Sequence, residues 1–320
     1  MISIITPAFN ETQTLKDLYA RIVHTMNALA VEWEWVVVDD HSSDDTFGVV
    51  RQLAASDPRV RGVRLARNGG SHAAIACGLH LAGGDAVVLM ASDLQDPPET
   101  IGAMLERWRR GAQIVWAVRR SRPGDRAHSG FAALYYWVVR KVVGLRDMPP
   151  TGSDFFLADR RVVQAFRQFP ERPTSLFNHL TWMGFRQEYV EYDKQPRAGG
   201  ASGWTFARKL RLVIDSVTAF SNAPLRWCAY VGAALVAIAL VLTIAGVALL
   251  PELGGGILVI LAVLVGLSGV QMLALATVGE YVWSALAETR RRPPYMIETA
   301  TSDAVVEAML PGRERHVGRA

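Results

Sequence analysis

Residues 35–40 read Trp35-Val36-Val37-Val38-Asp39-Asp40, a short apolar run that ends in two carboxylates. Such a run of aromatic and β-branched residues is typical of a strand that is buried on both faces. Similar runs alternate along the chain with segments of helical periodicity. The other strand-like runs are 2–6, 60–65, 86–90 and 114–118, and the helical segments are 14–29, 46–54, 71–81 and 98–110. The alternation predicts an α/β domain with a mostly parallel sheet, whose ligands bind at the carboxyl ends of the strands.

The composition excludes several classes of protein. The chain has 320 residues, of which 50% are hydrophobic, and 34 Lys+Arg against 30 Asp+Glu give a net charge of +4. This charge is too small to indicate nucleic-acid binding. Cys77 and Cys228 do not form a C-x-x-C pair, so a disulfide framework and a zinc-thiolate site are excluded. Because neither G-x-G-x-x-G nor G-x-x-x-x-G-K-[ST] occurs, we expect neither the usual dinucleotide fold nor a P-loop.

The second half of the chain contains two long uncharged segments, at about 227–250 and 257–278. The 24 residues of the first, at ~1.5 Å per residue, reach ~36 Å, enough to cross a ~30 Å hydrocarbon layer. Lys and Arg flank the pair but are absent from the turn between them, which favours cytosolic ends. The sequence predicts a two-helix transmembrane hairpin. It therefore predicts a multi-pass protein of the inner (cytoplasmic) membrane, with the N-terminal domain and both termini in the cytosol.

The hairpin divides the chain into four expected parts. Apolar residues recur at intervals of three and four between 206 and 220, which predicts an amphipathic helix at the membrane interface. Small residues four apart, such as Ala233 and Ala237, favour close packing of helices and homo-oligomerisation. The expected parts are 1–204, the cytosolic α/β domain; 205–224, the amphipathic juxtamembrane helix and linker; 225–283, the two transmembrane helices; and 284–320, a cytosolic tail.

Carboxylates cluster after two of the predicted strands. Asp39 and Asp40 follow the 35–38 strand, and Asp93 and Asp96 follow the 86–90 strand. The carboxyl ends of parallel strands lie at one edge of a sheet, and Mg²⁺ binds one or two carboxylates together with substrate phosphates. The two clusters are therefore candidates for holding a divalent cation and a nucleotide. Each cluster alone is also typical of a turn or a helix cap.

Several ordered motifs resemble those of one enzyme family. They are Thr6-Pro7-Ala8-Phe9-Asn10-Glu11, Val37-Val38-Asp39-Asp40-His41-Ser42, Arg67-Asn68-Gly69-Gly70 and Asp93-Leu94-Gln95-Asp96-Pro97-Pro98-Glu99. Their order is similar to that in the GT-A glycosyltransferases of family 2. Segments 118–125, 152–155 and 197–202, with the two uncharged segments, resemble the polyprenyl-phosphate glycosyltransferase branch. That branch includes dolichol-phosphate mannose synthase and bacterial undecaprenyl-phosphate glucosyl- and aminoarabinosyltransferases.

The resemblance implies an activity and a set of site residues. The activity is inverting transfer of a sugar from a nucleotide-diphosphate sugar, with a UDP-sugar favoured, to a polyprenyl phosphate such as undecaprenyl phosphate. The implied cofactor is Mg²⁺ or Mn²⁺, held by Asp93 and Gln95. The other implied positions are Pro7, Phe9, Glu11, Asp39, Asp40 and Asp93 for the nucleotide, Arg119, Arg197 and Ser202 for the substrates, and Asp154 with Asp93 for catalysis.

The chain departs from the family pattern at five positions. Ala91 stands where an Asp is frequent, His41 and Asp45 where Gly is usual, Phe156 where an Arg is common, and Gly203 where a Lys is common. The last two changes remove cations near anionic substrates. Two other interpretations stay open: a non-catalytic, membrane-tethered module that binds a nucleotide sugar, and a processive polysaccharide synthase. The sequence lacks the Gln-x-x-Arg-Trp motif that such synthases carry.

Overall fold

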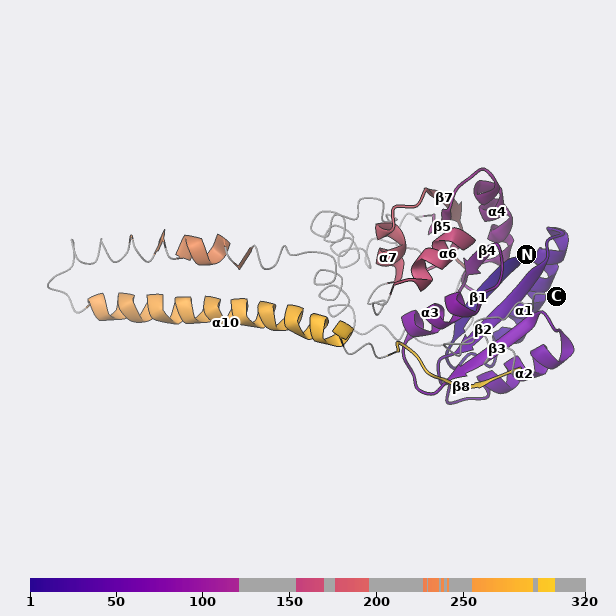
Figure 1. Cartoon of the computed structure of the whole chain (residues 1–320), viewed down its shortest axis with the longest axis horizontal. Helices are drawn as coiled ribbons and strands as arrows, with labels where there is room; N and C mark the ends of the chain where they lie inside the picture. Colours follow the sequence, from indigo (N-terminus) through magenta and orange to yellow (C-terminus); the bar gives the residue numbers. More distant parts are fainter. Residues whose placement is uncertain are drawn as a thin grey trace, which may run out of the picture. The chain divides into compact units, whose positions relative to one another are not determined.

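The computed structural model describes residues 1–120, 154–169, 176–195, 227–228, 230–235, 237–238, 241, 255–289 and 293–302. These residues fall into two compact units. The first contains the described residues up to 195 together with 293–302, and the second contains those from 227 to 289. Figure 1 labels most of the elements of both units.

The first unit is built on a mixed sheet with the strand order β7-β5-β6-β4-β1-β2-β3-β8. The pairs β1·β2, β1·β4, β2·β3 and β5·β7 are parallel, whereas β6 pairs antiparallel with both β4 and β5, and β8 pairs antiparallel with β3. The expected α/β fold with a mostly parallel sheet is confirmed. The strands are β1 (Ile2–Ala8), β2 (Trp33–Asp39), β3 (Val60–Leu65), β4 (Ala86–Leu89), β5 (Ile114–Arg119), β6 (Phe156–Asp159), β7 (Gln187–Tyr192) and β8 (Ile297–Ala300).

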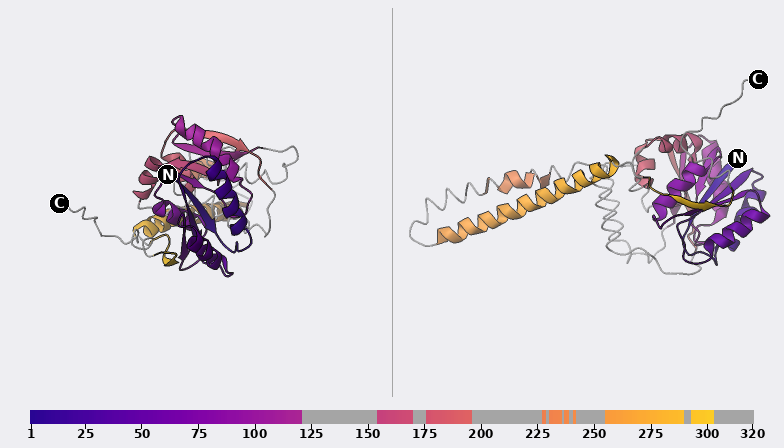
Figure 2. Two further views of the ribbon diagram at one scale, coloured as in Figure 1. Left: turned by 90° about the vertical axis from the view of Figure 1, so that its right-hand side faces the viewer. Right: turned by 60° about the horizontal axis from the view of Figure 1, so that its bottom comes forward.

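Helices pack on both faces of this sheet (Figures 1 and 2). Side chains alternate along each strand, so that Trp35 and Val37 join one hydrophobic core while Val36 and Val38 join the other. The first core includes apolar residues of α1, α2 and α4, and the second includes those of α3, α6 and α7. The helices are α1 (Leu15–Ala28), α2 (Thr46–Ser56), α3 (Ser71–Leu81), η1 (Pro98–Thr100), α4 (Ile101–Arg109), α6 (Arg160–Arg167) and α7 (Leu176–Trp182).

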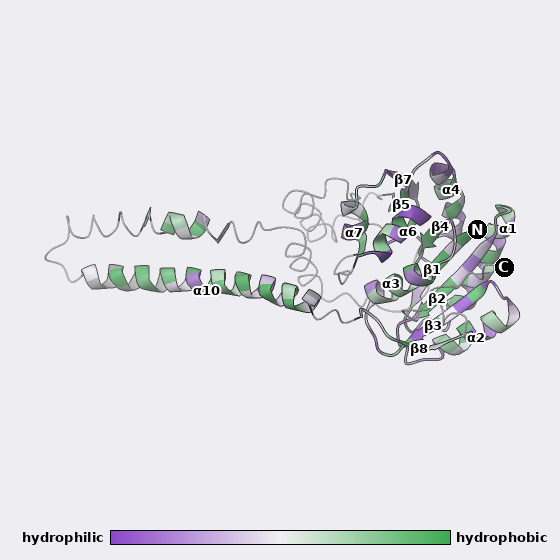
Figure 3. Ribbon diagram, viewed as in Figure 1, coloured by the Kyte–Doolittle hydropathy of each residue, from purple (hydrophilic) through white to green (hydrophobic). Residues whose placement is uncertain are grey.

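The apolar character of the central strands explains this layered arrangement. In Figure 3 the residues of β4 are coloured as hydrophobic, while α6, which is rich in arginine, is largely hydrophilic. All four residues of β4 are buried. A strand that is apolar on both sides stabilises the fold only when helices cover both faces of its sheet, as the helices of the first unit do here.

Residues 293–302 return to the sheet of the first unit. Val63 pairs with Ala300, and Thr301 Oγ1 accepts a hydrogen bond of 3.0 Å from the backbone N–H of Gly62. Figure 2 shows β8 in gold along the edge of the sheet. This strand was not among those expected from the sequence.

The second unit contains α10 (Gly255–Thr289), a helix of 35 residues that includes the second predicted span. The first predicted span is described only in helical pieces, at 227–228, 230–235, 237–238 and 241. Within this unit Cys228 Sγ lies 3.6 Å from Thr277 Oγ1. The predicted division of the chain into four parts stays a prediction.

The structure does not support the predicted location in a membrane. A helix that crosses a bilayer needs ~20 consecutive residues that are mainly apolar. In the part of the chain that the structure describes, no helix is long and apolar enough to cross a membrane. This finding contradicts the prediction that the chain is a multi-pass protein of the inner membrane, and that prediction is wrong. The predicted transmembrane hairpin is left unsupported. The predicted interface helix at 206–220 lies outside the described residues.

Candidate active site

The carboxyl ends of β1 and β2 lie side by side, because Ala8 pairs with Asp39 in the parallel register of the two strands. The backbone N–H of Asp40 donates to the carbonyl of Ala8 at 2.9 Å and extends this pairing beyond the strand ends. The loops that follow β1 and β2 therefore start from the same place. They carry the positions expected to bind the nucleotide.

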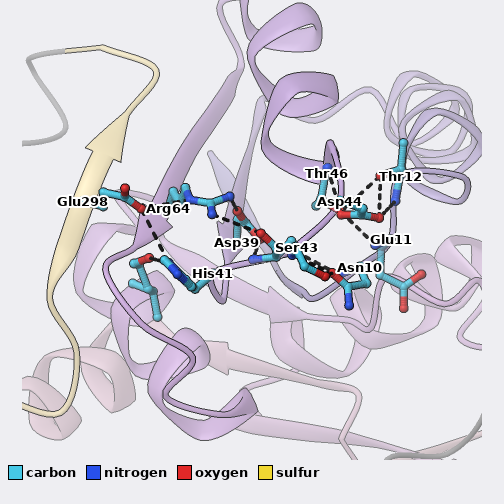
Figure 4. Close-up of polar contacts among 12 residues, drawn as sticks. Asn10, Glu11, Thr12, Asp39, His41, Ser43, Asp44, Thr46, Arg64 and Glu298 are labelled. Atoms are coloured by element: carbon cyan, nitrogen blue, oxygen red, sulfur yellow. Dashed lines mark hydrogen bonds and ion pairs between the residues drawn. The ribbon is translucent and has the colours of Figure 1, made fainter.

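Asp39 is fully buried and its carboxylate is occupied within the protein (Figure 4). Oδ2 accepts a hydrogen bond of 3.0 Å from Arg64 Nη1, and Oδ1 accepts from the backbone N–H of Ser42 at 3.0 Å and from the Ser42 hydroxyl. Arg64 also donates to Glu298 of β8 through Nε at 2.9 Å. Asp39 thus links β2 to β3 and, through Arg64, to the C-terminal strand.

Asp40 holds the loop that precedes α3. Its two carboxylate oxygens accept hydrogen bonds from the backbone N–H groups of Gly69 and Gly70 at 2.7 and 2.8 Å. Burial raises the pKa of Asp40, and the two backbone donors oppose this effect. Gly70 has φ +83°, a left-handed conformation that glycine adopts without strain. The Asn68-Gly69-Gly70 segment therefore depends on Asp40 for its conformation.

A polar network joins the loop after β1 to the start of α2 (Figure 4). Asn10 accepts a hydrogen bond through Oδ1 from the backbone N–H of Ser43 at 2.9 Å, and the N–H of Glu11 donates to Thr46 Oγ1 at 2.9 Å. Thr12 Oγ1 donates to Asp44 Oδ2 at 2.6 Å. These bonds fix the backbone around Phe9, whose side chain is 47% exposed at this edge. An exposed, positioned aromatic ring is suited to contact with a nucleotide base.

His41 explains one departure from the family pattern. Its backbone has φ +59°, the left-handed region in which glycine is favoured. Its ring Nδ1 lies 3.0 Å from the carbonyl oxygen of Leu65 and 3.6 Å from Glu298 Oε2. His41 therefore adopts a backbone conformation that glycine would adopt more easily, and its side chain contacts β3 and β8.

A second cluster of polar side chains lies at the ends of β4, β6 and β7. Tyr192 donates a hydrogen bond of 2.6 Å from its hydroxyl to Asp96 Oδ1, and Lys194 Nζ lies 3.8 Å from the same oxygen. Lys194 Nζ also lies 4.0 Å from Asp154 Oδ1. Asp93 is close enough to act electrostatically on Asp96. The structure therefore brings together Asp93 and Asp154, two of the residues named for catalysis.

Asp96 is the most deeply buried acid of this cluster. Burial, followed by the negative charge of Asp154, raises the pKa of Asp96 to about 6, although Lys194 and the Tyr192 hydroxyl oppose the increase. The burial of Tyr192 and the neighbouring Asp96 carboxylate raise the pKa of the Tyr192 phenol. Asp96 Oδ2 is buried and has no hydrogen-bond partner among the residues that the structure describes. A buried carboxylate oxygen without a partner is costly unless a cation lies nearby.

The donor atoms near Asp93 fit a Mg²⁺ or Mn²⁺ ion that completes its coordination with substrate oxygens. The backbone N–H of Gln95 donates to Asp93 Oδ1 at 3.2 Å, so the two predicted metal ligands share one turn. No group of three or more acidic, histidine or cysteine side chains that could hold a metal ion occurs among the described residues. A hard cation that binds one or two carboxylates plus phosphates does not need such a group. The unpartnered oxygen of Asp96 beside Asp93 and Asp154 agrees with a cation at this edge.

The remaining predicted site residues differ in how far the structure describes them. Arg119 ends β5 directly opposite Tyr192 in the parallel register, at the edge of the second cluster. Pro7 lies within β1, two residues before Phe9. Arg197 and Ser202 lie outside the described residues. The roles assigned to these positions stay predictions.

Two members of the second cluster, Tyr192 and Lys194, were not expected from the sequence, and Asp96 was expected only as part of the acidic cluster after the 86–90 strand. Asp96 lies inside the quoted motif 93–99, so its position after a strand was a usable signal. Tyr192 ends β7, a strand that was not predicted, Lys194 follows this strand, and no local motif marks either residue. Phe156, at a position where a cation was expected, is fully buried and packs on Trp116 with ring centroids 5.3 Å apart.

Comparisons with known proteins identify the family of the chain. The family model described as Glycosyl transferase family 2 matches residues 3–192. An uncharacterised glycosyltransferase of Synechocystis is 34% identical over 301 residues, covering 92% of this chain and 94% of the relative. The prophage bactoprenol glucosyl transferase homolog of Escherichia coli is 30% identical, with 93% of this chain and 98% of the relative covered. The bactoprenol glucosyl transferase of Shigella phage SfV has the same identity and coverage.

A solved structure shows the same type of fold. It is glucosyl-3-phosphoglycerate synthase from Mycobacterium tuberculosis in complex with Mn²⁺, UDP and phosphoglyceric acid. The TM-score is 0.50 at 19% sequence identity, and the match covers 68% of this chain and 78% of that chain.

Proposed function

Because the chain belongs to glycosyl transferase family 2 and is a glycosyltransferase, we propose that it transfers a sugar from a nucleotide-diphosphate sugar to a polyprenyl phosphate. The observation that carries this proposal is the match over 93% of the chain to relatives named for bactoprenol glucosyl transfer. A UDP-sugar is the favoured donor and undecaprenyl phosphate the favoured acceptor.

The loops that follow β1 and β2 form the proposed nucleotide site. Phe9 and Glu11 lie on the loop after β1, which is held in place by hydrogen bonds to the segment that starts α2. Together with Pro7, they contact the base and the ribose. Asp39 and Asp40 act mainly by holding the surrounding loops in place, because their oxygens already accept hydrogen bonds from the protein. This assignment refines their predicted role as direct nucleotide ligands.

The second cluster is the proposed reaction centre. Asp93 and Gln95 would hold a Mg²⁺ or Mn²⁺ ion, which would supply positive charge to offset the negative charge on the diphosphate leaving group. Asp154 lies at the reacting sugar carbon, and its side chain is 59% exposed, so a substrate can approach it. Arg119, Arg197 and Ser202 contribute contacts to the anionic substrates. These roles follow the family pattern and are supported by the grouping of Asp93, Asp96 and Asp154.

The chemistry of the acceptor determines what the protein must supply. A phosphate monoester has a second pKa of about 6, so it is largely dianionic at pH 7 and acts as a nucleophile without a general base. Its direct attack on the anomeric carbon displaces the nucleoside diphosphate and inverts the configuration. The main task of the protein is then to orient the two substrates and to stabilise negative charge on the leaving group.

The test is a transfer assay with the purified full chain. It is incubated with Mg²⁺, undecaprenyl phosphate in detergent and a panel of nucleotide sugars that begins with UDP-glucose, and the lipid product is identified by mass spectrometry. We expect a glycosyl-phosphoryl-undecaprenol with one of the UDP-sugars. Binding of UDP without formation of any glycolipid would reject this proposal and favour a binding module.

A further inference from the structure

The segment that follows β7 is fastened to the loop that carries the predicted metal ligands. The backbone N–H of Gln195 donates to the carbonyl of Gln95 at 2.9 Å, and the Tyr192 hydroxyl donates to Asp96. Gln195 Oε1 also accepts from Arg21 Nη1 at 3.2 Å. Lys194 lies between these attachment points. Its backbone is therefore held beside the loop after β4, although the two segments are about a hundred residues apart in the chain.

The ammonium group of Lys194 points toward two carboxylates without making a hydrogen bond to either. Nζ lies 3.8 Å from Asp96 Oδ1 and 4.0 Å from Asp154 Oδ1, whereas an N–H···O hydrogen bond spans about 2.7–3.2 Å. The lysine side chain is only 22% exposed. An ammonium group has three N–H donors. The two carboxylates thus hold the charge in place and leave its donors able to bind another anion.

The position of this cation matches the need of the reaction. Both substrates bring phosphate groups to a place that already contains the carboxylates of Asp93, Asp96 and Asp154. Phosphates approach such a place only if cations offset the repulsion. Phe156 cannot provide one, because its side chain is an apolar ring buried in the core. Lys194 lies where it can do so.

We propose that Lys194 forms a phosphate-binding position of the reaction centre, in which its ammonium donates to a phosphate oxygen of the substrates. This inference rests on the proposed function, because a glycosyl transfer to a lipid phosphate supplies two such groups: the donor diphosphate and the acceptor monoester. Asp96 and Tyr192 are positioning residues for Lys194, since the Asp96 carboxylate lies beside its ammonium group and the Tyr192 hydroxyl fixes the end of β7.

The test compares Lys194→Met with Lys16→Met in the full chain. Lys16 lies exposed on α1 and makes a matched control for the loss of one lysine charge. Three quantities are measured for each protein: the Kd of UDP with Mg²⁺, the KM of undecaprenyl phosphate and kcat. Lys194→Arg, which keeps the charge, is the rescue variant, and thermal melting checks that all variants fold.

Loss of one hydrogen bond from a charged donor corresponds to about a tenfold or larger change in a binding constant. If Lys194 binds the donor diphosphate, Lys194→Met raises the Kd of UDP by about this factor. If it binds the acceptor phosphate, the Kd of UDP stays unchanged and the KM of undecaprenyl phosphate rises instead. In either case Lys194→Arg recovers part of the loss and Lys16→Met behaves as wild type.

A Lys194→Met protein that folds and keeps both constants overturns the inference, whatever its kcat. Failure of the proposed function gives a different result: the wild-type protein binds UDP but forms no glycolipid. Binding of UDP and of inorganic phosphate is then compared between wild type and Lys194→Met without any turnover. Weaker binding of either anion still supports the phosphate position, and equal binding of both rejects it.

Discussion

Asp93 is the residue on which the proposed metal chemistry depends. Replacing its carboxylate with an amide in Asp93→Asn removes a negative charge from a place where Ala91 already lacks one. We expect metal-dependent transfer to fall by roughly 10²-fold or more, with the thermal stability unchanged. Initial rates across a Mg²⁺ titration measure the effect, and Asp17→Asn, at an exposed acid on α1, is the control. Full activity of Asp93→Asn, or wild-type activity in excess chelator, would contradict the metal assignment.

Asp154 is expected to respond differently from Asp93. It lies near Lys194 at the proposed reacting carbon rather than at the diphosphate. Asp154→Asn should therefore leave the Kd of UDP within error of wild type and lower kcat by about tenfold or more. Calorimetric UDP binding and steady-state kinetics separate the two effects. A large loss of UDP binding in Asp154→Asn would place this residue at the donor instead.

Asp57 offers a test of stability outside the active site. Hydrogen bonds from Arg59 lower the pKa of Asp57 to about 2 from an ordinary value of 3.8, although burial opposes them, and the Tyr19 hydroxyl contributes at 2.7 Å. Because the folded-state pKa is lowered, the stabilisation is complete above the unfolded value and is lost as the pH falls from about 4 towards 2. Asp57→Asn should cost roughly 2 kcal/mol of unfolding free energy at pH 7.

Urea unfolding of wild type and Asp57→Asn between pH 7 and pH 3 measures this contribution. The difference between the two proteins should be constant down to about pH 5 and should shrink below it. Tyr19→Phe, which removes one of the hydrogen bonds to Asp57, should show a smaller loss with the same pH trend. A difference that did not depend on pH would mean that packing rather than charge stabilises this position.

At the scale of elements, the approach of α3 to β1 depends on one glycine. A Cβ atom added to Gly78 would lie 2.4 Å from Ile5 Cγ2 of the central strand. Gly78→Ala should therefore push α3 away from the sheet and destabilise the fold by about 1–3 kcal/mol. Thermal or urea unfolding provides the measurement. Gly83→Ala, whose Cβ would meet its neighbours only at 3.6 Å, is the control and should change stability much less.

At the scale of the whole molecule, residues near the end of the chain complete the sheet that begins at residue 2. β8 covers the edge of β3, and Glu298 contacts the same Arg64 that holds Asp39 in the proposed nucleotide site. A chain that ends at residue 292 should therefore unfold at a lower temperature than the full chain and bind UDP more weakly. A chain that ends at residue 302 keeps β8 and is the control.

Equal melting temperatures and equal UDP affinities of these two truncated chains would show that β8 is dispensable. The comparison matters for any shorter version of the protein. A chain cut after residue 222 would lose β8 together with the second unit. Weak nucleotide binding by such a fragment would then reflect the missing edge strand as well as the missing helices.

Local sequence patterns determined much of the α/β fold. The apolar runs of β1 to β5 and the helical periodicity of α1 to α4 depend on neighbouring residues only, so a single sequence carries them. The ordered motifs at 6–11, 37–42 and 93–99 indicated the glycosyltransferase family for the same reason. The hydropathy of the second half was also a local signal, and the location inferred from it was contradicted.

Long-range pairing decided the rest. β6 enters the sheet antiparallel between β4 and β5, and β8 adds to β3 from more than two hundred residues away, so no local pattern predicts either pairing. The sequence alone determined which carboxylates follow strands, but only the tertiary structure decided what each one contacts. Asp39 and Asp40 became internal hydrogen-bond acceptors because the registers of β2 and β3 bring Arg64 and the glycine loop to them. Lys194 meets Asp96 and Asp154 because three strand ends converge at one edge of the sheet, and a charge can be recognised as part of a site only when its neighbours in space are known.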